Sequence, residues 1–286
     1  DTMTSRVPAR VAAGSGTPRQ SVLSRPPNRA SRSPQTTRPR HQASPMLAII
    51  GGTGLTRLST LAVTHRQVIR TPYGEPSAAL VFGELAGHRA IFLARHGHGH
   101  TIPPHRVNYR ANLWALKEQG ASCIVAIASV GAIRGCAPGD LVLPHQLIDY
   151  TWGRAHTFFD GGDQQVVHVD FTHPDSQRLR AICLAGARHG SIAMRDGGVY
   201  GAVSGPRLET TAEIDRMDRD GATLVGMTGM PEAVLAREVG VDYASVCVVV
   251  NHAAGRGDSV ANVSMETIGN VLESAMDRVR ELIPHI

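Results

Sequence analysis

The stretch LAIIGGTG, residues 47–54, gives the first indication of the fold. Four consecutive apolar residues suit a strand that is buried on both faces, and the glycine-rich run after them is typical of a tight turn. The same arrangement recurs at residues 90–97, where AIFLA precedes Arg-His-Gly, and at residues 123–131, where CIVAIA precedes Ser-Val-Gly. Such strands, when they alternate with helices, predict an α/β fold with helices on both faces of a sheet.

Helical patterns lie between the predicted strands and complete this alternation. Thr210 and Glu213 have the spacing of a capping box, and Pro231 suits the first turn of a helix. The remaining predicted strands are residues 140–143, 223–226 and 243–250. The predicted helices are residues 108–119, 210–219, 231–238 and 265–282.

Residues 1–45 differ in composition from the rest of the chain. They hold eight Arg and one acidic residue, whereas the remainder holds 21 basic and 23 acidic side chains. With many Pro and Ser and few large apolar residues, the segment is predicted to be a disordered tail. It has the composition of an organelle transit peptide, but it lacks an amphipathic helical period. We favour an extended or misassigned start, with Met46 as the real beginning, and we expect the folded part to be residues 46–286.

The charge distribution and the cysteines narrow the functional classes. Because the excess of positive charge belongs to the tail, nucleic acid is not an expected partner of the folded part. No apolar window is long enough for a membrane span, so no membrane partner is expected. The four cysteines show no CxxC spacing, and Cys123 and Cys247 lie in apolar runs that suit small buried side chains. A reduced, cytoplasmic setting is therefore predicted.

Small or polar residues follow each apolar strand, and this pattern predicts the site. In an open α/β sheet, ligands bind outside the carboxyl ends of the strands, so these clusters are expected to form one pocket. Gly-Gly-Thr-Gly alone is weak evidence, because it lacks the dinucleotide pattern and can be a simple turn. Arg95 beside His96 suits an oxyanion, since a guanidinium makes forked bonds to phosphate. A solvated loop is the plain alternative, and the alternating histidines lack the further ligands that a metal requires.

Five separate motifs identify a family. They are IIGGTGL (49–55), LARHG (93–97), VNYRANLWALK (107–117), GPRLE (205–209) and VGMTGMPE (225–232). Together they resemble the methylthioadenosine phosphorylase branch of the purine nucleoside phosphorylase family, over about residues 46–284. The resemblance implies a three-layer α/β/α fold with a mixed, partly barrel-like central sheet. It also implies a homotrimer, with inorganic phosphate as co-substrate and neither a metal nor another cofactor.

The resemblance also implies roles for individual residues. Met227 is expected against the ribose, and His96, Glu209 and Asn251 are expected to be catalytic. Phosphorolysis must position a dianion below the sugar and stabilise charge on the departing base, which calls for positioning and electrostatics rather than a protein nucleophile. The expected phosphate-binding residues are Thr53, Arg95, His96, Ala128, Ser129 and Thr228.

Glu209 and Asn251 indicate which base is bound. Adenine-specific relatives have a Ser in place of Glu209 and an Asp-x-Asp pair where this chain reads Asn251, His252 and Ala253. An ionised Glu accepts only, so it matches the N1–H of a 6-oxopurine, and an amide accepts at N7–H while donating toward O6. Glu209 as a helix-opening acid and Asn251 as a strand terminator are the alternatives. His252 and Ala253 are expected beside the base, His252 as a bystander rather than a catalyst.

Met265 indicates the group at the 5′ position. Ordinary nucleoside phosphorylases have a polar residue, usually His, at the matching place near the start of the last helix. A thioether there suits a methylthio group, whereas the alternative is a simple core residue. The expected substrate is S-methyl-5′-thioinosine. Methylthioadenosine phosphorylase, general inosine/guanosine phosphorylase and a nucleotide-binding module without activity are the remaining alternatives.

Overall fold

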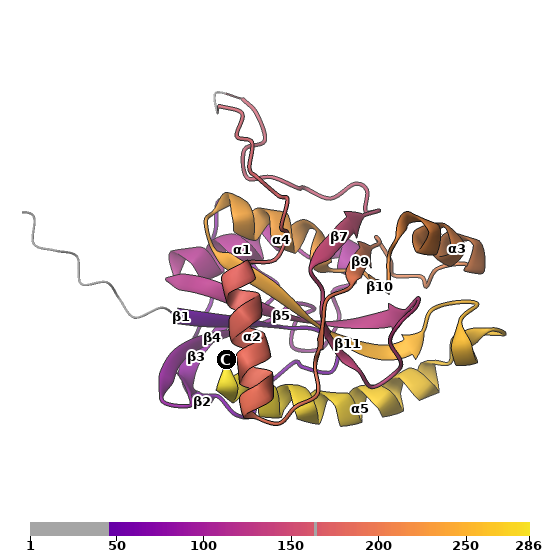
Figure 1. The fold of residues 1–286 in the computed structure, drawn as a ribbon. Helices are drawn as coiled ribbons and strands as arrows, with labels where there is room; N and C mark the ends of the chain where they lie inside the picture. Colours follow the sequence, from indigo (N-terminus) through magenta and orange to yellow (C-terminus); the bar gives the residue numbers. More distant parts are fainter. Residues whose placement is uncertain (1–45, 163–164) are drawn as a thin grey trace, which may run out of the picture. The chain divides into compact units, whose positions relative to one another are not determined.

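The computed structural model describes residues 46–162 and 165–286, and the predicted disorder of residues 1–45 lies outside them. Groups of strands are separated by helices along the described chain, as Figure 1 shows. The strands are β1 (Met46–Gly51), β2 (Ala62–Gln67), β3 (Leu80–Leu85), β4 (His88–Ala94), β5 (Ala121–Ala132), β6 (Leu141–Leu143), β7 (Gln146–Asp149), β8 (Arg195–Asp196), β9 (Val199–Ala202), β10 (Leu224–Gly226) and β11 (Asp242–His252). The α-helices are α1 (Tyr109–Glu118), α2 (Gln177–His189), α3 (Thr211–Asp220), α4 (Gly229–Glu238) and α5 (Met265–Leu282).

The described strands form one mixed sheet that branches at β5. Its hydrogen-bonded order is β2-β3-β4-β1-β5-β10-β9-β7, and β11 pairs with the other side of β5 and leads to β6 and β8. β1 and β11 run parallel to β5, whereas β10 is antiparallel to the last residues of β5. The sheet is mixed because it contains both parallel and antiparallel pairs. The described strands do not close into a ring, so the sheet is only partly barrel-like.

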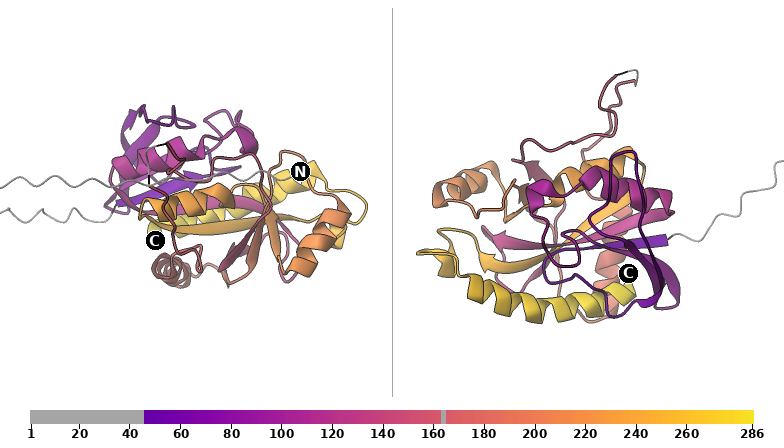
Figure 2. Two further views of the ribbon diagram at one scale, coloured as in Figure 1. Left: turned by 90° about the horizontal axis from the view of Figure 1, so that it is seen from above. Right: turned by 180° about the vertical axis from the view of Figure 1, so that it is seen from behind.

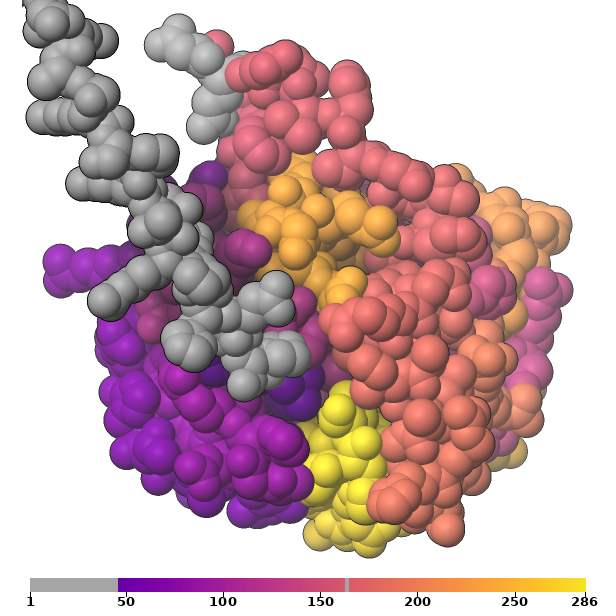
Figure 3. All heavy atoms as spheres, turned by 60° about the vertical axis from the view of Figure 1, so that its left-hand side comes forward, coloured from indigo at the N-terminus to yellow at the C-terminus, as the bar shows by residue number. Residues whose placement is uncertain are grey.

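Helices cover both faces of the sheet because β1 alternates its side chains between two cores. Ala48 and Ile50 pack with α1 and α4, whereas Ile49 packs with α2 and α5. Figures 1 and 2 show α1 and α4 on one side and α2 and α5 on the other. Figure 3 shows the C-terminal residues, in yellow, between the strands near the start of the domain and α2. The predicted three-layer α/β/α arrangement is confirmed.

Capping and periodicity signals in the sequence predicted the positions of several elements correctly. Thr210 and Glu213 form the predicted capping box of α3, and α5 covers the predicted residues 265–282. Met230 is non-helical, so the regular turns of α4 begin at the predicted Pro231. Strands β2, β3 and β7 to β9 and helix α2 were not predicted from the sequence. Of the helices described, none has the length and apolarity that crossing a membrane requires.

Candidate active site

A cavity of about 570 Å³ lies where β1, β4, β10 and β11 end and where β5 passes between them. Its position at the strand ends follows from the parallel pairing of β1, β4, β5 and β11, which brings their carboxyl ends together. Ten of the predicted site residues line it. They are Thr53, Arg95, His96, Ala128, Ser129, Glu209, Met227, Thr228, Asn251 and Met265.

Arg95 lies fully buried at the inner end of the cavity and is held by a carboxylate. Its Nε and Nη2 donate to the two carboxylate oxygens of Glu232 at 2.5 and 2.8 Å, and its Nη1 donates to the Ile127 carbonyl at 2.8 Å. A guanidinium carries five N–H donors, so two remain for a ligand. Glu232 on α4 therefore fixes the plane in which Arg95 presents its charge.

A buried hydrogen-bond chain continues behind Glu232. The Tyr243 hydroxyl donates to Glu232 at 3.0 Å, and the Ser245 hydroxyl donates to the Tyr243 oxygen at 3.2 Å. Burial raises the pKa of Tyr243 well above its ordinary value, and the neighbouring Glu232 raises it further. The tyrosine hydroxyl therefore stays protonated and acts as a donor to the carboxylate that orients Arg95.

His96 is neutral near pH 7 and its tautomer follows from its partner. Its Nδ1 lies 2.8 Å from the Ile102 carbonyl, which can only accept, so Nδ1 carries the proton. Burial, and then the charge of Arg95, lower the pKa of His96 to about 4, although the bond to Ile102 opposes the shift. Nε2 is thus an acceptor, which suits the O–H of a hydrogen phosphate ion.

The glycine-rich turn after β1 brings backbone close to Arg95. A Cβ on Gly52 would lie 2.5 Å from the Ile127 oxygen and 3.0 Å from Nη1 of Arg95, so only glycine fits there. Across the cavity, the backbone N–H groups of Thr228 and Gly229 donate to the Tyr200 hydroxyl at 3.2 and 3.4 Å. These two amides therefore already have a partner, and Thr228, the N-cap residue of α4, lines the cavity.

Glu209 faces the cavity from the residue before the N-cap of α3. The helix start is already capped by Thr210 and Glu213, and Glu213 also pairs with Arg207. Capping of α3 therefore does not depend on Glu209. Burial raises the pKa of Glu209 and Glu213 adds to this, whereas its own backbone N–H and Arg207 oppose the shift. A half-buried acceptor thus stands at the cavity wall.

Asn251 presents its amide from a bulge in β11. The register of β11 against β5 shifts between Val249 and Asn251, and the strand ends one residue later, at His252. Its Nδ2 donates to the His252 carbonyl at 2.6 Å. This bond identifies which amide atom is nitrogen, and it leaves Oδ1 and the second N–H of Nδ2 available to a ligand.

The structure places two predicted residues elsewhere. His252 and Ala253 are not among the lining residues of the cavity. Successive strand residues point to opposite faces, so His252 turns away and its Nδ1 accepts from the Asp258 backbone N–H at 3.4 Å. Ala253 is buried in an apolar cluster with Ile133 and Val225. Their expected place beside the base is thereby corrected.

Met265 and the histidines of the loop after β4 take different positions. Met265 lines the cavity at the first residue of α5 and is 68% exposed in the single chain, so it is not a core residue. His100 lines the same cavity, whereas His98 lines a separate surface pocket. In the part of the chain that the structure describes, no group of His, Cys, Asp and Glu has the arrangement of a metal site.

Comparisons with known proteins agree with this geometry. The family model described as "Phosphorylase superfamily" matches residues 46–286. The chain belongs to this superfamily. A "Probable S-methyl-5′-thioinosine phosphorylase" of Pseudomonas syringae pv. tomato is 48% identical over 240 residues, which cover 84% of this chain and 97% of that protein. Its namesake in Xanthomonas campestris pv. campestris is 50% identical over 238 residues, covering 83% and 95%.

Solved structures give the same family at the level of the fold. Methylthioadenosine phosphorylase from Schistosoma mansoni in complex with adenine matches with a TM-score of 0.80 and 31% identity, covering 84% of this chain and 90% of that one. The chain is thus a nucleoside phosphorylase, a pentosyltransferase enzyme. A carboxylate, an amide, hydroxyls and a guanidinium lie around its cavity.

Sequence reasoning gave no role to two charged residues, Glu232 and Arg154, that make hydrogen bonds to residues lining the cavity or to its bordering loops. Glu232 was quoted within a motif but received no role, although a charged residue among the apolar positions of a helix is a usable signal. Arg154 lies in the segment after β7, where no periodic pattern marks it. Its guanidinium donates to carbonyl groups of two loops that border the cavity, which only the folded arrangement reveals.

Proposed function

We propose that this phosphorylase converts S-methyl-5′-thioinosine and inorganic phosphate into hypoxanthine and S-methyl-5-thio-α-D-ribose 1-phosphate. A phosphate oxygen forms the new bond to C1′ while the bond from C1′ to N9 breaks, and its electron pair stays on the purine. The departing purine takes up one proton at a ring nitrogen, and the proton of the hydrogen phosphate ion balances it. Arg95, His96 and the hydroxyls of Thr53 and Thr228 are the proposed phosphate contacts, and the backbone near Ser129 assists. The proposal involves no metal and no other cofactor.

The observation that carries the base assignment is the pair formed by Glu209 and Asn251 on one cavity. An ionised Glu209 accepts from the N1–H of a 6-oxopurine and repels the bare N1 of adenine. Asn251 accepts from N7–H through Oδ1, and its second N–H is directed to O6. Each buried mismatch costs roughly 1–3 kcal/mol, so two of them are sufficient to select the base.

The names of the relatives support the methylthio group, and Met265 is its proposed contact. The thioether of Met265 gives an apolar neighbour to the 5′ substituent and no hydrogen-bond partner to a 5′-hydroxyl. The exposure of Met265 in the single chain favours one competing candidate, a general 6-oxopurine nucleoside phosphorylase that also accepts inosine. The proposed assembly is a cytoplasmic homotrimer. Light scattering tests the oligomeric state, since a trimer has three times the mass of the chain.

A three-substrate phosphorolysis assay tests the reaction and its substrate. With phosphate present, S-methyl-5′-thioinosine should give hypoxanthine and the sugar phosphate in equal amounts, and without phosphate no base should be released. Inosine should react with a kcat/KM at least about tenfold lower, since the 5′-hydroxyl loses a hydrogen bond worth about 1.4 kcal/mol. Equal values for the two nucleosides would establish the general enzyme, and a clear preference for S-methyl-5′-thioadenosine would overturn the base assignment.

A further inference from the structure

Arg154 connects two loops that border the active-site cavity. Its Nη1 donates to the carbonyls of Met227, at 2.8 Å, and of Met230. Its Nη2 donates to the carbonyls of Ser204, at 3.0 Å, and of Val203, at 3.3 Å. One guanidinium thus binds four backbone oxygens, two from each loop.

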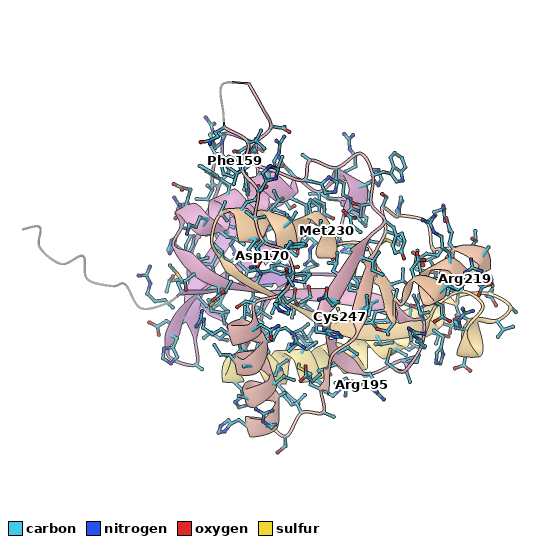
Figure 4. The ribbon with its side chains drawn as sticks, turned by 45° about the horizontal axis from the view of Figure 1, so that its top comes forward. Phe159, Asp170, Arg195, Arg219, Met230 and Cys247 are labelled. Atoms are coloured by element: carbon cyan, nitrogen blue, oxygen red, sulfur yellow. The ribbon has the colours of Figure 1, made fainter. Side chains whose placement is uncertain are left out.

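Each of the two loops carries a different part of the site. The loop after β9, which contains Val203 and Ser204, leads through the GPRLE motif to Glu209, the proposed base-binding carboxylate. The loop between β10 and α4 places Met227 and Thr228 in the cavity, and Met230 precedes the segment that carries Glu232. Figure 4 labels Met230, and that side chain packs in one apolar cluster with Cys247 of β11.

The hydrogen bonds between β9 and β10 end near the start of the two loops. β9 and β10 are parallel neighbours from Tyr200 to Ala202, and a last bond runs from the Val203 N–H to the Gly226 carbonyl at 2.8 Å. Beyond that bond no backbone hydrogen bond links the two loops within the described chain, although Gly205 lies against the Met227 side chain. The four bonds of Arg154 lie next to this last sheet bond, so they link the two loops where the sheet pairing has ended.

The chemistry of the position calls for an arginine. Within the described chain Arg154 has no carboxylate within salt-bridge distance, and its charge is balanced by four carbonyl dipoles. The guanidinium also lies 5.2 Å from the centre of the Tyr109 ring, which fixes its plane. A planar fork binds pairs of oxygens in a set geometry, whereas a lysine ammonium is a compact point charge.

We propose that Arg154 is a positioning residue for phosphorolysis, which holds the base-binding loop and the ribose- and phosphate-binding loop at the separation that the substrate requires. The inference rests on the proposed function for its kinetic consequence. A displacement of about 1 Å between reacting groups costs on the order of 10²-fold in rate. Loss of the clamp should therefore reduce the rate without removing any group that touches the substrate.

Arg110 on α1 offers a matched control, because it contacts the segment that carries Arg154. It donates to Asp160 at 2.7 Å and to the Thr157 carbonyl at 3.4 Å, and it lies 5.0 Å from the centre of the Tyr73 ring. Like Arg154, it ties the segment after β7 to the body of the domain and contacts an aromatic ring. Unlike Arg154, it contacts neither of the two loops.

The test compares Arg154→Met, Arg154→Lys and Arg110→Met by steady-state kinetics and by hydrogen–deuterium exchange of the whole chain. Arg154→Met should lower kcat/KM about 10²-fold for both nucleoside and phosphate, and exchange should rise at residues 203–209 and 227–231. Arg154→Lys should recover part of the rate, and Arg110→Met should stay within about threefold of the parent with unchanged exchange in both loops.

Two results would overturn the inference. One is an equal loss of rate in Arg154→Met and Arg110→Met, which would show that Arg154 only anchors its own segment. The other is unchanged exchange in both loops of the Arg154 variants. If the parent chain releases no base from any purine nucleoside, the proposed function fails instead, and the exchange experiment still decides whether Arg154 holds the two loops.

Discussion

Replacement of Glu232 by Gln tests how the phosphate side of the site is built. Arg95 and Glu232 are both fully buried and share two hydrogen bonds, at 2.5 and 2.8 Å. Gln keeps one oxygen acceptor but removes the negative charge, so a buried guanidinium loses its counter-charge. Breaking a buried ion pair on one side costs about 3–5 kcal/mol. Because Gln retains one bond, we expect a loss of about 3 kcal/mol in the free energy of unfolding.

Thermal unfolding and phosphate kinetics measure this effect. A loss of about 3 kcal/mol lowers the Tm of a domain of this size by roughly 6–12 °C. Phosphate should restore part of that loss, because its charge replaces the missing carboxylate beside Arg95. The shift in Tm caused by phosphate should therefore be larger in Glu232→Gln than in the parent, while kcat falls about tenfold or more as Arg95 loses its orientation.

Glu238 provides the control on the same helix. It accepts from the Phe158 backbone N–H at 2.8 Å, and within the described chain it has no salt-bridge partner. Glu238→Gln keeps that acceptor, so its stability and phosphate kinetics should match those of the parent. The reasoning is refuted if Glu232→Gln is as stable as the parent, or if phosphate stabilises both proteins equally.

Three further predictions concern the base side of the site and a buried acid. Asn251→Asp should lower kcat/KM for S-methyl-5′-thioinosine by about 10²-fold. A carboxylate cannot donate to O6, and it is repelled by the His252 carbonyl, which in the parent accepts from Asn251 Nδ2 at 2.6 Å. Unchanged kinetics would show that Asn251 does not recognise the base. Burial raises the pKa of Glu209, and its ionised carboxylate is a stronger acceptor for N1–H than the protonated acid. The kcat/KM for this nucleoside should therefore fall as the pH falls through that raised pKa, and Glu209→Gln should abolish this limb. An identical profile in the variant would count against the assignment. Burial raises the pKa of Asp175 to about 7, although the Ser245 backbone N–H opposes the shift, so the folded state holds a proton that the unfolded state releases between about pH 4 and 7. This group therefore lowers the free energy of unfolding of the parent as the pH rises. The free energy of unfolding of Asp175→Asn should exceed that of the parent by an amount that grows by up to roughly 4 kcal/mol between pH 4 and 8. A difference between variant and parent that stays constant across this range would contradict the prediction.

The elements that sequence reasoning located are those in which local signals and tertiary packing agree. Helix α5 has an amphipathic pattern and an N-cap at Ser264, and β11 is a long apolar run at the centre of the sheet. The missed elements lack such signals. β2 is exposed along its whole length, and β8 has two residues, so their pairing depends on neighbours rather than on a pattern of their own.

The same distinction applies to the site. The residues at strand ends, such as Thr53, Arg95 and Asn251, could be gathered into one pocket because parallel strands bring their carboxyl ends together. Arg154 could not be found in this way, because its four partners are backbone carbonyls that any sequence supplies. The expectation for His252 failed because the alternation of side chains along β11 turns it away from Asn251.

A direct competition between two bases is the sharpest test of the central claim. Equimolar S-methyl-5′-thioinosine and S-methyl-5′-thioadenosine are mixed with phosphate and enzyme, and the initial rates of hypoxanthine and adenine release are measured together. Their ratio equals the ratio of the two kcat/KM values. Glu209 and Asn251 predict that hypoxanthine exceeds adenine by at least about tenfold, since one buried mismatch of about 1.4 kcal/mol is worth that factor. Equal rates, or an excess of adenine, would contradict the account.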